Sequence, residues 1–269
     1  HWLVAVITAV LVFSLSGTTA SAASANPELP PKSGSFDYQL GQPYAPAQGV
    51  KIVARDSTAK PAPKAYNICY VNGFQTQPGE LKKWPKKLLL KKSGKLVRDP
   101  GWPDEVLLNS STRAKRKAIA AKLKPAIKRC KTRGFDAVEF DNLDSWTRSK
   151  GKLRKSNNVN LAKSLVRTTH AYGLAAGQKN TPQLGKTGKT KIKFDFAVAE
   201  QCLRYRECGA YTKVYGRSLV FDIEYADDLD LTWAKACARR DRPTRMILRD
   251  HNLVSPARDD YVFATCEVR

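Results

Sequence analysis

Short runs of β-branched and other apolar residues recur along the chain, with helical or loop-like stretches between them. The runs follow one another at intervals of about 30 residues, the size of a βαβ unit, and eight units in about 250 residues fit a (β/α)8 barrel. We therefore predict an α/β fold, a TIM barrel in a single domain. The eight predicted strands are residues 36–40, 50–56, 65–73, 136–142, 174–180, 194–201, 219–225 and 245–250.

Two stretches between these strands have the composition of helices. Residues 112–131 combine apolar positions with many lysines and arginines, and Pro125 is expected to kink or divide this helix. Residues 159–172 follow a cap region that contains Asn157 and Asn158, and they end at Gly173, a common helix terminator. Strands that alternate with helices predict parallel βαβ units.

The beginning of the chain has a different composition. An apolar run over residues 3–15 is followed by small residues that match the small-x-small pattern of a cleavage site. We predict a signal peptide at 1–25, with an uncleaved anchor as the alternative, then a flexible lead-in at 26–35 and the barrel domain at 36–269. The mature chain is expected to be a secreted, extracellular monomer without a transmembrane span.

The six cysteines are consistent with export. An even number of cysteines in an oxidising compartment predicts three disulfides, and no pair has the C-x-x-C spacing of a zinc ribbon. Fifteen pairings are possible, and the sequence alone does not choose among them. The favoured arrangement joins the near pair Cys202 and Cys208, ties down the C-terminus through Cys237 and Cys266, and leaves Cys69 with Cys130.

Each predicted strand ends in or near a polar side chain. In a barrel these ends meet on one face, where the active sites of this fold lie. Loop solvation explains an exposed Asp or Asn, but it explains poorly a charge inside an apolar run, such as Glu200 or Lys179. We therefore predict a shared functional pocket at this face. The polar residues are Gln39, Asp56, Asn72, Asp141, Lys179, Asn180, Glu200, Glu224 and Asp250.

Acidic residues on two of the strands indicate acid–base chemistry. Period-two alternation places Glu139 and Asp141 on one face of a strand, with Val138 and Phe140 on the other, and Glu200 ends another strand. Two acids over a partly apolar floor suit a nucleophile and a general acid, because burial and mutual repulsion separate their pKa values.

Other chemistries lack their sequence signatures. The mature chain has two histidines, His170 and His251, which are not spaced as ligands, so we expect no metal and no cofactor. It has no G-x-S-x-G elbow, no G-x-G-x-x-G fingerprint and no P-loop. Two-carboxylate hydrolysis remains, with glycosides as the natural substrate class.

Seven blocks carry a family resemblance. They are FDYQL at 36–40, ICYV at 68–71, GWPDEVLLN at 101–109, GFDAVEFDNLD at 134–144, GLAAGQKN at 173–180, FDFAVAEQC at 194–202 and VFDIEY at 220–225. In this order they resemble glycoside hydrolase family 114, the endo-α-1,4-polygalactosaminidases. The resemblance implies a secreted (β/α)8 enzyme that cleaves α-1,4-linked galactosamine or N-acetylgalactosamine polymers. Its motif places the catalytic pair at Asp141 and Glu200, and we assign Asp141 as nucleophile and Glu200 as acid/base.

The resemblance also implies a set of substrate contacts. The sequence departs from the family pattern at residues 53–56 and 73–77, and at Phe140, where proline is common in the family. These departures concern the substrate subsites more than the catalytic chemistry. The implied substrate-binding residues are Asp37, Tyr38, Asn142, Asp144, Lys179, Asn180, Tyr205, Glu224 and Tyr225.

The charge of the chain bears on its partners. It has 47 Lys and Arg against 24 Asp and Glu, a formal net charge of +23. Such a surface attracts polyanions and repels a fully deacetylated, cationic polymer, so we expect an N-acetylated or anionic glycan, or attachment to anionic cell-envelope polymers. The alternative is that the lysine-rich stretches are merely solvated surface. The rival function is a non-catalytic basic module that binds anionic glycan or nucleic acid on a barrel scaffold, although no nucleic-acid-binding motif indicates a specific nucleic acid.

Overall fold

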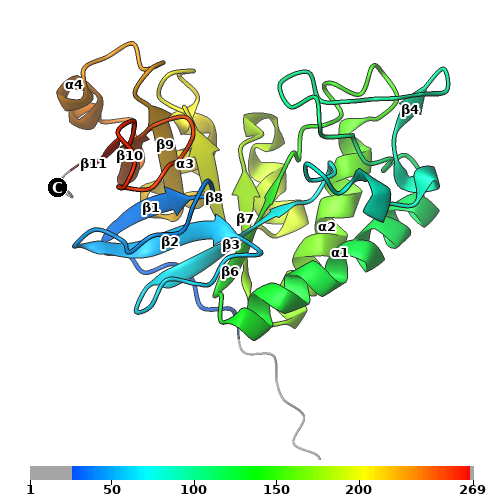
Figure 1. Cartoon of the computed structure of the whole chain (residues 1–269), viewed down its shortest axis with the longest axis horizontal. Coiled ribbons are helices and arrows are strands. Elements are labelled where there is room, and N and C mark those ends of the chain that lie inside the picture. Colours follow the sequence, from blue (N-terminus) through cyan, green and yellow to red (C-terminus); the bar gives the residue numbers. More distant parts are fainter. Residues whose placement is uncertain (1–25, 267–269) are drawn as a thin grey trace, which may run out of the picture.

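The structure of the protein is a computed structural model that describes residues 26–266; the predicted signal peptide at 1–25 lies outside the described residues. One curved sheet of parallel strands forms its centre (Figure 1). All eight predicted strands are confirmed, with ends that differ by at most two residues. In sheet order they are β1 (Ser35–Gln39), β2 (Val50–Asp56), β3 (Tyr66–Asn72), β6 (Ala137–Asp141), β7 (Ala175–Lys179), β8 (Phe196–Glu200), β9 (Val220–Tyr225) and β10 (Arg245–Arg249).

Alternating side chains separate the two faces of this sheet. Residues such as Phe36, Ile68 and Phe221 form an apolar cluster inside the barrel. Val138 and Phe140 face outward into a larger cluster that contains the buried sides of α1 (Arg113–Arg133) and α2 (Lys155–Ala171). The two long helices lie side by side on one flank of the sheet (Figure 1). The result is a TIM-barrel-like α/β domain.

The ends of α1 and α2 depart from the predicted ones. Helix α1 begins after Thr112, whose hydroxyl accepts a hydrogen bond from the Lys115 amide, and it continues through Pro125 without being divided. Helix α2 begins four residues earlier than predicted, because the side chain of Asn157 accepts a hydrogen bond from the Arg154 amide and caps the first turn from within it.

The other connections contain shorter elements, and within residues 26–266 no helix joins β1 to β2 or β2 to β3. The barrel is therefore not followed by a helix after every strand, as eight βαβ units would require. No helix in the described part of the chain is long and apolar enough to span a bilayer. The shorter elements are the hairpin β4 (Lys91–Lys92) and β5 (Lys95–Leu96), helices α3 (Cys208–Tyr215) and α4 (Trp233–Ala238), the 3-10 turns Leu81–Lys83, Lys86–Leu88, Pro182–Leu184 and Arg217–Leu219, the π-helical turn Gly188–Ile192, and β11 (Phe263–Thr265), which is antiparallel to β10.

Side chains close the barrel between its first and last parallel strands. Strands β1 and β10 are in contact, but no backbone ladder joins them among the described strands. Arg249 forms a fully buried ion pair with Asp37 at 3.1 Å and also contacts the Tyr38 carbonyl. The Arg245 Nε donates to the Gly34 carbonyl at 2.9 Å. These side-chain contacts from β10 hold it against β1 and the residue before it, where no backbone ladder joins the two strands.

Three disulfides fasten outer segments to the barrel, in the arrangement that the sequence favoured. One joins β3 to α1, one joins the start of the loop after β8 to the start of α3, and one joins α4 to the segment after β11. The pairs are Cys69 with Cys130, Cys202 with Cys208, and Cys237 with Cys266.

Candidate active site

A cavity of about 610 Å³ opens at the carboxyl ends of the strands. Six strands each contribute a lining side chain near their ends, namely Asp56 (β2), Tyr70 (β3), Asp141 (β6), Lys179 (β7), Glu200 (β8) and Tyr225 (β9). The long connection after β3 adds further lining residues, including Trp102 and Glu105, and the loop after β10 adds His251. Side chains far apart in the sequence thus share one hollow, where a barrel places its active site.

Lys179 lies between the two acids at the centre of this cavity. Its Nζ is 3.8 Å from Oδ2 of Asp141 and 3.2 Å from Oε2 of Glu200. These two carboxylate oxygens therefore lie no more than about 7 Å apart. Burial alone would lower the pKa of Lys179, but Asp141, Glu200 and Glu139 together raise it, so the ammonium stays charged.

Donors from three neighbours hold the carboxylate of Glu200. Oε1 accepts from the Tyr225 hydroxyl at 2.5 Å, and Oε2 accepts from Asn180 Nδ2 at 2.9 Å and contacts Lys179. Burial opposes ionisation, but Lys179 and these hydrogen bonds outweigh it and lower the pKa of Glu200. The side chain is still 28% exposed, so a substrate in the cavity can reach an ionised carboxylate.

Asp141 is held in a similar way. Its Oδ2 accepts from the Tyr70 hydroxyl at 2.9 Å, and its Oδ1 accepts from the backbone amide of Asn142 at 2.6 Å. Burial, together with the charge of Asp141, raises the pKa of Tyr70 well above its ordinary value, so this phenol remains a donor. The carboxylate is 20% exposed and its orientation is fixed by both bonds.

A left-handed residue follows each of the three charged side chains in the sequence. Asn142, Asn180 and Gln201 have φ values of 61°, 46° and 58°, a region that asparagine tolerates better than most residues. The chain therefore turns away directly after Asp141, Lys179 and Glu200, whose side chains stay at the mouth. Backbone strain of this kind gathers at functional sites.

Glu139 forms the floor beneath the pair. Its carboxyl is fully buried, and neither oxygen has a hydrogen-bond partner among the described residues. Burial raises the pKa of Glu139 to about 8; Lys179 opposes the shift and Asp141 adds to it. The carboxyl is therefore neutral at pH 7. The position of Glu139 inside the barrel fits the prediction that Glu139 and Asp141 share one face of the strand.

The structure brings part of the predicted binding set into the cavity. Asp141, Asn142, Lys179, Glu200 and Tyr225 line it. Asn180 lies behind Glu200, and the hydroxyl of fully buried Tyr38 accepts a hydrogen bond from Lys179 at 2.7 Å. These two residues therefore act on the lining residues rather than on the cavity itself.

Other predicted binding residues have structural partners instead. Fully buried Asp37 is paired with Arg249, and fully buried Glu224 accepts from the amides of Leu203 and Arg204, so it holds the loop after β8. Neither residue lines the cavity in this structure, and a contact of either with substrate stays a prediction. Glu224 was expected as a polar strand end and Asp37 from the family resemblance, but neither line of argument could show which partner each one meets.

Two further predicted residues lie outside the cavity lining. Asp144 forms an ion pair with Arg148 at 2.7 Å, and Tyr205 is 59% exposed on the loop after β8. Four of the polar strand ends, Asp56, Asp141, Lys179 and Glu200, do line the shared cavity. The predicted pocket is therefore present, with fewer members than the strand ends suggested.

Some residues that line the cavity were not identified as site residues from the sequence. Tyr70 follows Ile68 by two positions on β3, so the same alternation that placed Glu139 would have found it. Glu105 accepts from Asn72 and Gln75, both at 2.8 Å, and comes from a long irregular connection that carries no periodic signal. His251 stacks on Tyr225 with ring centroids 4.0 Å apart, and only the folded loop shows this contact.

One group of three potential metal ligands occurs among residues 26–266, formed by Cys202, Cys208 and Asp222. The two sulfurs are joined to each other in a disulfide, so they are not free thiolates that could bind an ion. The lining of the cavity itself provides four acidic side chains, one lysine and two phenols.

Comparison with known proteins agrees with this geometry. The profile of glycoside-hydrolase family GH114 matches residues 17–269. The crystal structure of Aspergillus fumigatus Ega3 in complex with galactosamine is similar at a TM-score of 0.69 and 21% identity, covering 90% of this chain and 98% of that chain. The glycoside hydrolase domain of PelA from Pseudomonas aeruginosa is similar at a TM-score of 0.56 and 12% identity, covering 87% and 98%. Among curated proteins there is no significant match.

The two solved structures share the barrel fold with this chain. The family profile matches its sequence from the predicted signal region to the last residue, and therefore includes every strand and both acids at the mouth. The chain belongs to glycoside-hydrolase family GH114.

Proposed function

We propose that this protein is a secreted endo-acting hydrolase of α-1,4-linked galactosamine or N-acetylgalactosamine polymers. The observation that carries the proposal is the contact of one buried ammonium, Lys179, with two solvent-accessible carboxylates, Asp141 and Glu200. The similarity to Ega3, whose crystal structure contains galactosamine, supports the sugar class.

In the proposed double displacement, a carboxylate oxygen of Asp141 attacks the anomeric carbon while Glu200 gives a proton to the departing glycosidic oxygen. This step forms a glycosyl ester and breaks the glycosidic bond. Water then attacks the same carbon, Glu200 takes its proton, and Asp141 is released as a carboxylate. Every atom needed comes from the two acids, the polymer and one water.

Glu200 must acquire a proton before it can serve as the acid. Lys179 and the hydrogen bonds from Tyr225 and Asn180 lower its pKa against the effect of burial, so without substrate contacts it is ionised. A sugar that displaces the Tyr225 hydroxyl or separates Glu200 from Lys179 removes a stabilising donor and raises this pKa toward the range of a general acid. The opposite assignment, with Glu200 as nucleophile, is the alternative that experiment must exclude.

The local charge of the cavity favours an amino sugar. Four acidic side chains line it, from Asp56, Glu105, Asp141 and Glu200, whereas the one lysine in the lining, Lys179, is already paired with two of them. The overall charge of +23 led us to expect repulsion of a deacetylated polymer. A cationic residue inside the cavity meets local attraction instead, because charges within a few ångströms outweigh distant screened ones.

The shape of the mouth supports endo cleavage. A second hollow of about 280 Å³ is lined in part by Asp56, Gln77 and Pro78, which also line the catalytic cavity. The two hollows are therefore neighbours that share part of their walls. We expect the polymer to extend beyond the cavity toward the second hollow, which a closed exo-type pocket would prevent.

Release of reducing ends from defined polymers tests the proposal. The substrates are α-1,4-galactosamine polymers that are deacetylated, partly acetylated and fully acetylated, with a β-1,4-glucosamine polymer as the control. We expect hydrolysis of one or more galactosamine polymers, with an early fall in viscosity that marks internal cleavage. Binding of the polymers without hydrolysis would support the rival, a non-catalytic binding module.

Two isosteric variants test the catalytic pair. Asp141→Asn and Glu200→Gln should each lower kcat by at least about 1000-fold, with little change in Tm, since each keeps the shape of the side chain. Azide distinguishes the roles: for a nucleophile variant it should yield a glycosyl azide of inverted configuration, and for an acid/base variant one of retained configuration. An inverted azide from Glu200→Gln would reverse our assignment.

A further inference from the structure

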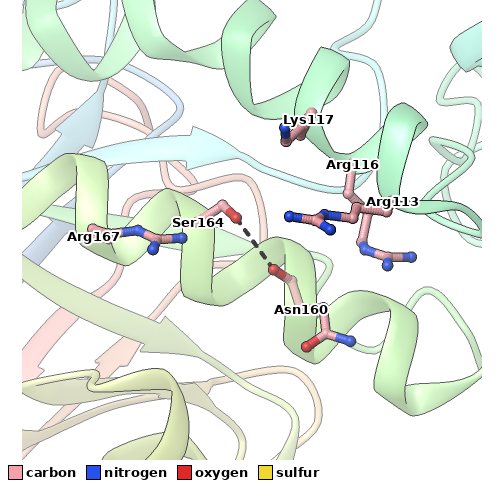
Figure 2. A pocket seen from close by; sticks show the side chains of 6 residues that line it. All are labelled: Arg113, Arg116, Lys117, Asn160, Ser164 and Arg167. Carbon is pink, nitrogen blue, oxygen red and sulfur yellow. Dashed lines mark hydrogen bonds between the residues drawn. The ribbon is translucent and has the colours of Figure 1, made fainter.

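A second concave site lies on the outer flank of the barrel, away from the strand ends. It is a cleft of about 360 Å³ between α1 and α2, lined by six polar side chains (Figure 2). Four of the six are cationic, and none is acidic. They are Arg113, Arg116, Lys117, Asn160, Ser164 and Arg167.

Helical spacing brings these side chains together. On α1, Arg116 and Lys117 follow Arg113 by three and four positions, and on α2, Ser164 and Arg167 follow Asn160 by four and seven. Residues at these intervals share one helix face. Each helix therefore directs one polar stripe toward the other, and Figure 2 shows side chains from both helices extending into the space between them.

The cations in the cleft have no acidic partner. Helices α1 and α2 contain no Asp or Glu, and no ion pair among the described residues involves Arg113, Arg116, Lys117 or Arg167. Like charges on one helix face repel each other, and here no anion of the protein relieves the repulsion. An external anion would relieve it.

One of the arginines is fixed in place. Arg116 Nη1 donates to the Ser110 carbonyl at 2.8 Å and to the Ser111 carbonyl at 3.2 Å, and the side chain is only partly exposed. Both hydrogen bonds use one terminal nitrogen, so the other donors of the guanidinium remain available. The cleft thus contains a preorganised donor among three flexible cations.

We propose that this cleft binds the oxyanion groups of an anionic polysaccharide and so attaches the protein to a negatively charged matrix. A groove with cations on both walls fits a polymer that carries a carboxylate, sulfate or phosphate on successive sugars, because several such groups contact it at once. The cleft contains no aromatic side chain, so it offers no platform on which nucleic-acid bases could stack.

The site is distinct from the catalytic cavity, since the two share no lining residue. Binding can therefore be measured without turnover, and its failure leaves the proposed hydrolase function untouched. The probes are polygalacturonate and dextran sulfate, with neutral dextran and single-stranded DNA as comparisons. Dissociation constants are measured for the full chain at several salt concentrations.

A matched pair of variants isolates the cleft. The test variant is Arg113→Gln/Lys117→Gln/Arg167→Gln, which leaves the anchored Arg116 in place. The control is Lys86→Gln/Lys124→Gln/Lys128→Gln, which removes the same charge from exposed positions that do not line the cleft. Circular dichroism verifies that both fold.

We expect the test variant to bind polygalacturonate and dextran sulfate at least tenfold more weakly than the parent, with a shallower dependence on salt. The control should lose no more than threefold. Equal losses in the two variants, or none in either, would overturn the proposal, since binding would then be diffuse or elsewhere. Tighter binding of single-stranded DNA than of either polysaccharide, lost in the test variant, would overturn it in favour of nucleic acid.

Discussion

The side chain of Asn180 makes two hydrogen bonds to Glu200, one at each end of the residue. Its Nδ2 donates to the carboxylate at 2.9 Å, and its Oδ1 accepts from the Glu200 amide at 2.7 Å. The end of β7 thereby fixes both the position and the direction of the acid at the end of β8.

Asn180→Asp tests this relationship. The variant keeps the acceptor for the Glu200 amide but replaces the donor with a negative charge, so Glu200 is repelled and its pKa rises. We expect kcat to fall about 100-fold with little change in KM, because misplacing a catalytic group by about 1 Å costs that much. Steady-state kinetics across pH check this, with Asn26→Asp, at an exposed position outside the cavity lining, as the control. An unchanged kcat would contradict it.

Lys179→Met removes the shared counter-charge at similar length. Because this ammonium lowers the pKa of Glu200, its loss should raise that pKa and move the alkaline limb of the pH–rate profile, where the general acid loses its proton, to higher pH. We also expect kcat/KM to fall at least about 100-fold. Breaking a buried pair also destabilises by about 3–5 kcal/mol, more at pH 8 than at pH 5, where carboxylates begin to protonate. Exposed Lys152→Met serves as the control, and an alkaline limb that does not move would refute the assignment.

Glu139→Gln tests the buried proton. The unfolded chain loses this proton near pH 4.5, whereas the folded protein keeps it up to about pH 8. Between these values the native state binds more protons, so its free energy of unfolding falls as pH rises, by up to about 1.4 kcal/mol per pH unit. The variant has no such proton and should lose less stability between pH 5 and 8. Urea unfolding at both pH values measures the difference, and parallel pH dependences would show that Glu139 is ionised when folded.

Trp102 and Tyr205 form a matched pair of exposed aromatics. Trp102 is 67% exposed and lines the cavity, whereas Tyr205 is 59% exposed and does not. Trp102→Ala should raise KM about tenfold, since stacking on a ligand contributes about 1 kcal/mol or more, and should leave Tm unchanged. Tyr205→Ala should change neither. An equal rise in KM for both would return Tyr205 to the binding surface that the family resemblance assigned to it.

The buried pair at the barrel seam is expected to stabilise the fold. Arg249→Met leaves the Asp37 carboxylate buried without its partner and should lower the free energy of unfolding by about 3–5 kcal/mol. Adding Asp37→Asn removes the unpaired charge and should restore part of this loss. Denaturant titration of the single and double variants measures the coupling, and additive effects would show that the two residues do not interact.

The sequence predicted the strands well because each is a short apolar run bounded by turn residues. Alternation on β6 also placed Glu139 beside Asp141. It could not assign partners: Asp37 and Glu224 look as functional as Glu200 until the fold shows one paired with Arg249 and the other with loop amides. These contacts join residues far apart in the chain, and local patterns carry no information about them.

The long connection after β3 was the least predictable part of the site. It contributes Trp102 and Glu105 to the cavity, yet its short 3-10 turns and two-residue strands have no regular period. Likewise, the sequence showed that α1 is basic but not that Arg116 and Arg167 border a common cleft, because that depends on how two helices pack.

The absence of a backbone ladder between β1 and β10 gives the barrel one line along which it can part without breaking sheet hydrogen bonds. Local opening of the barrel should begin along this line, so the backbone amide hydrogens of β1 and β10 should exchange with solvent first. Strand β6 is separated from that line by β1, β2 and β3, and β8 is separated from it by β9 and β10. The rigid half of the barrel is therefore the half that carries Asp141 and Glu200, and their spacing survives motion at the seam.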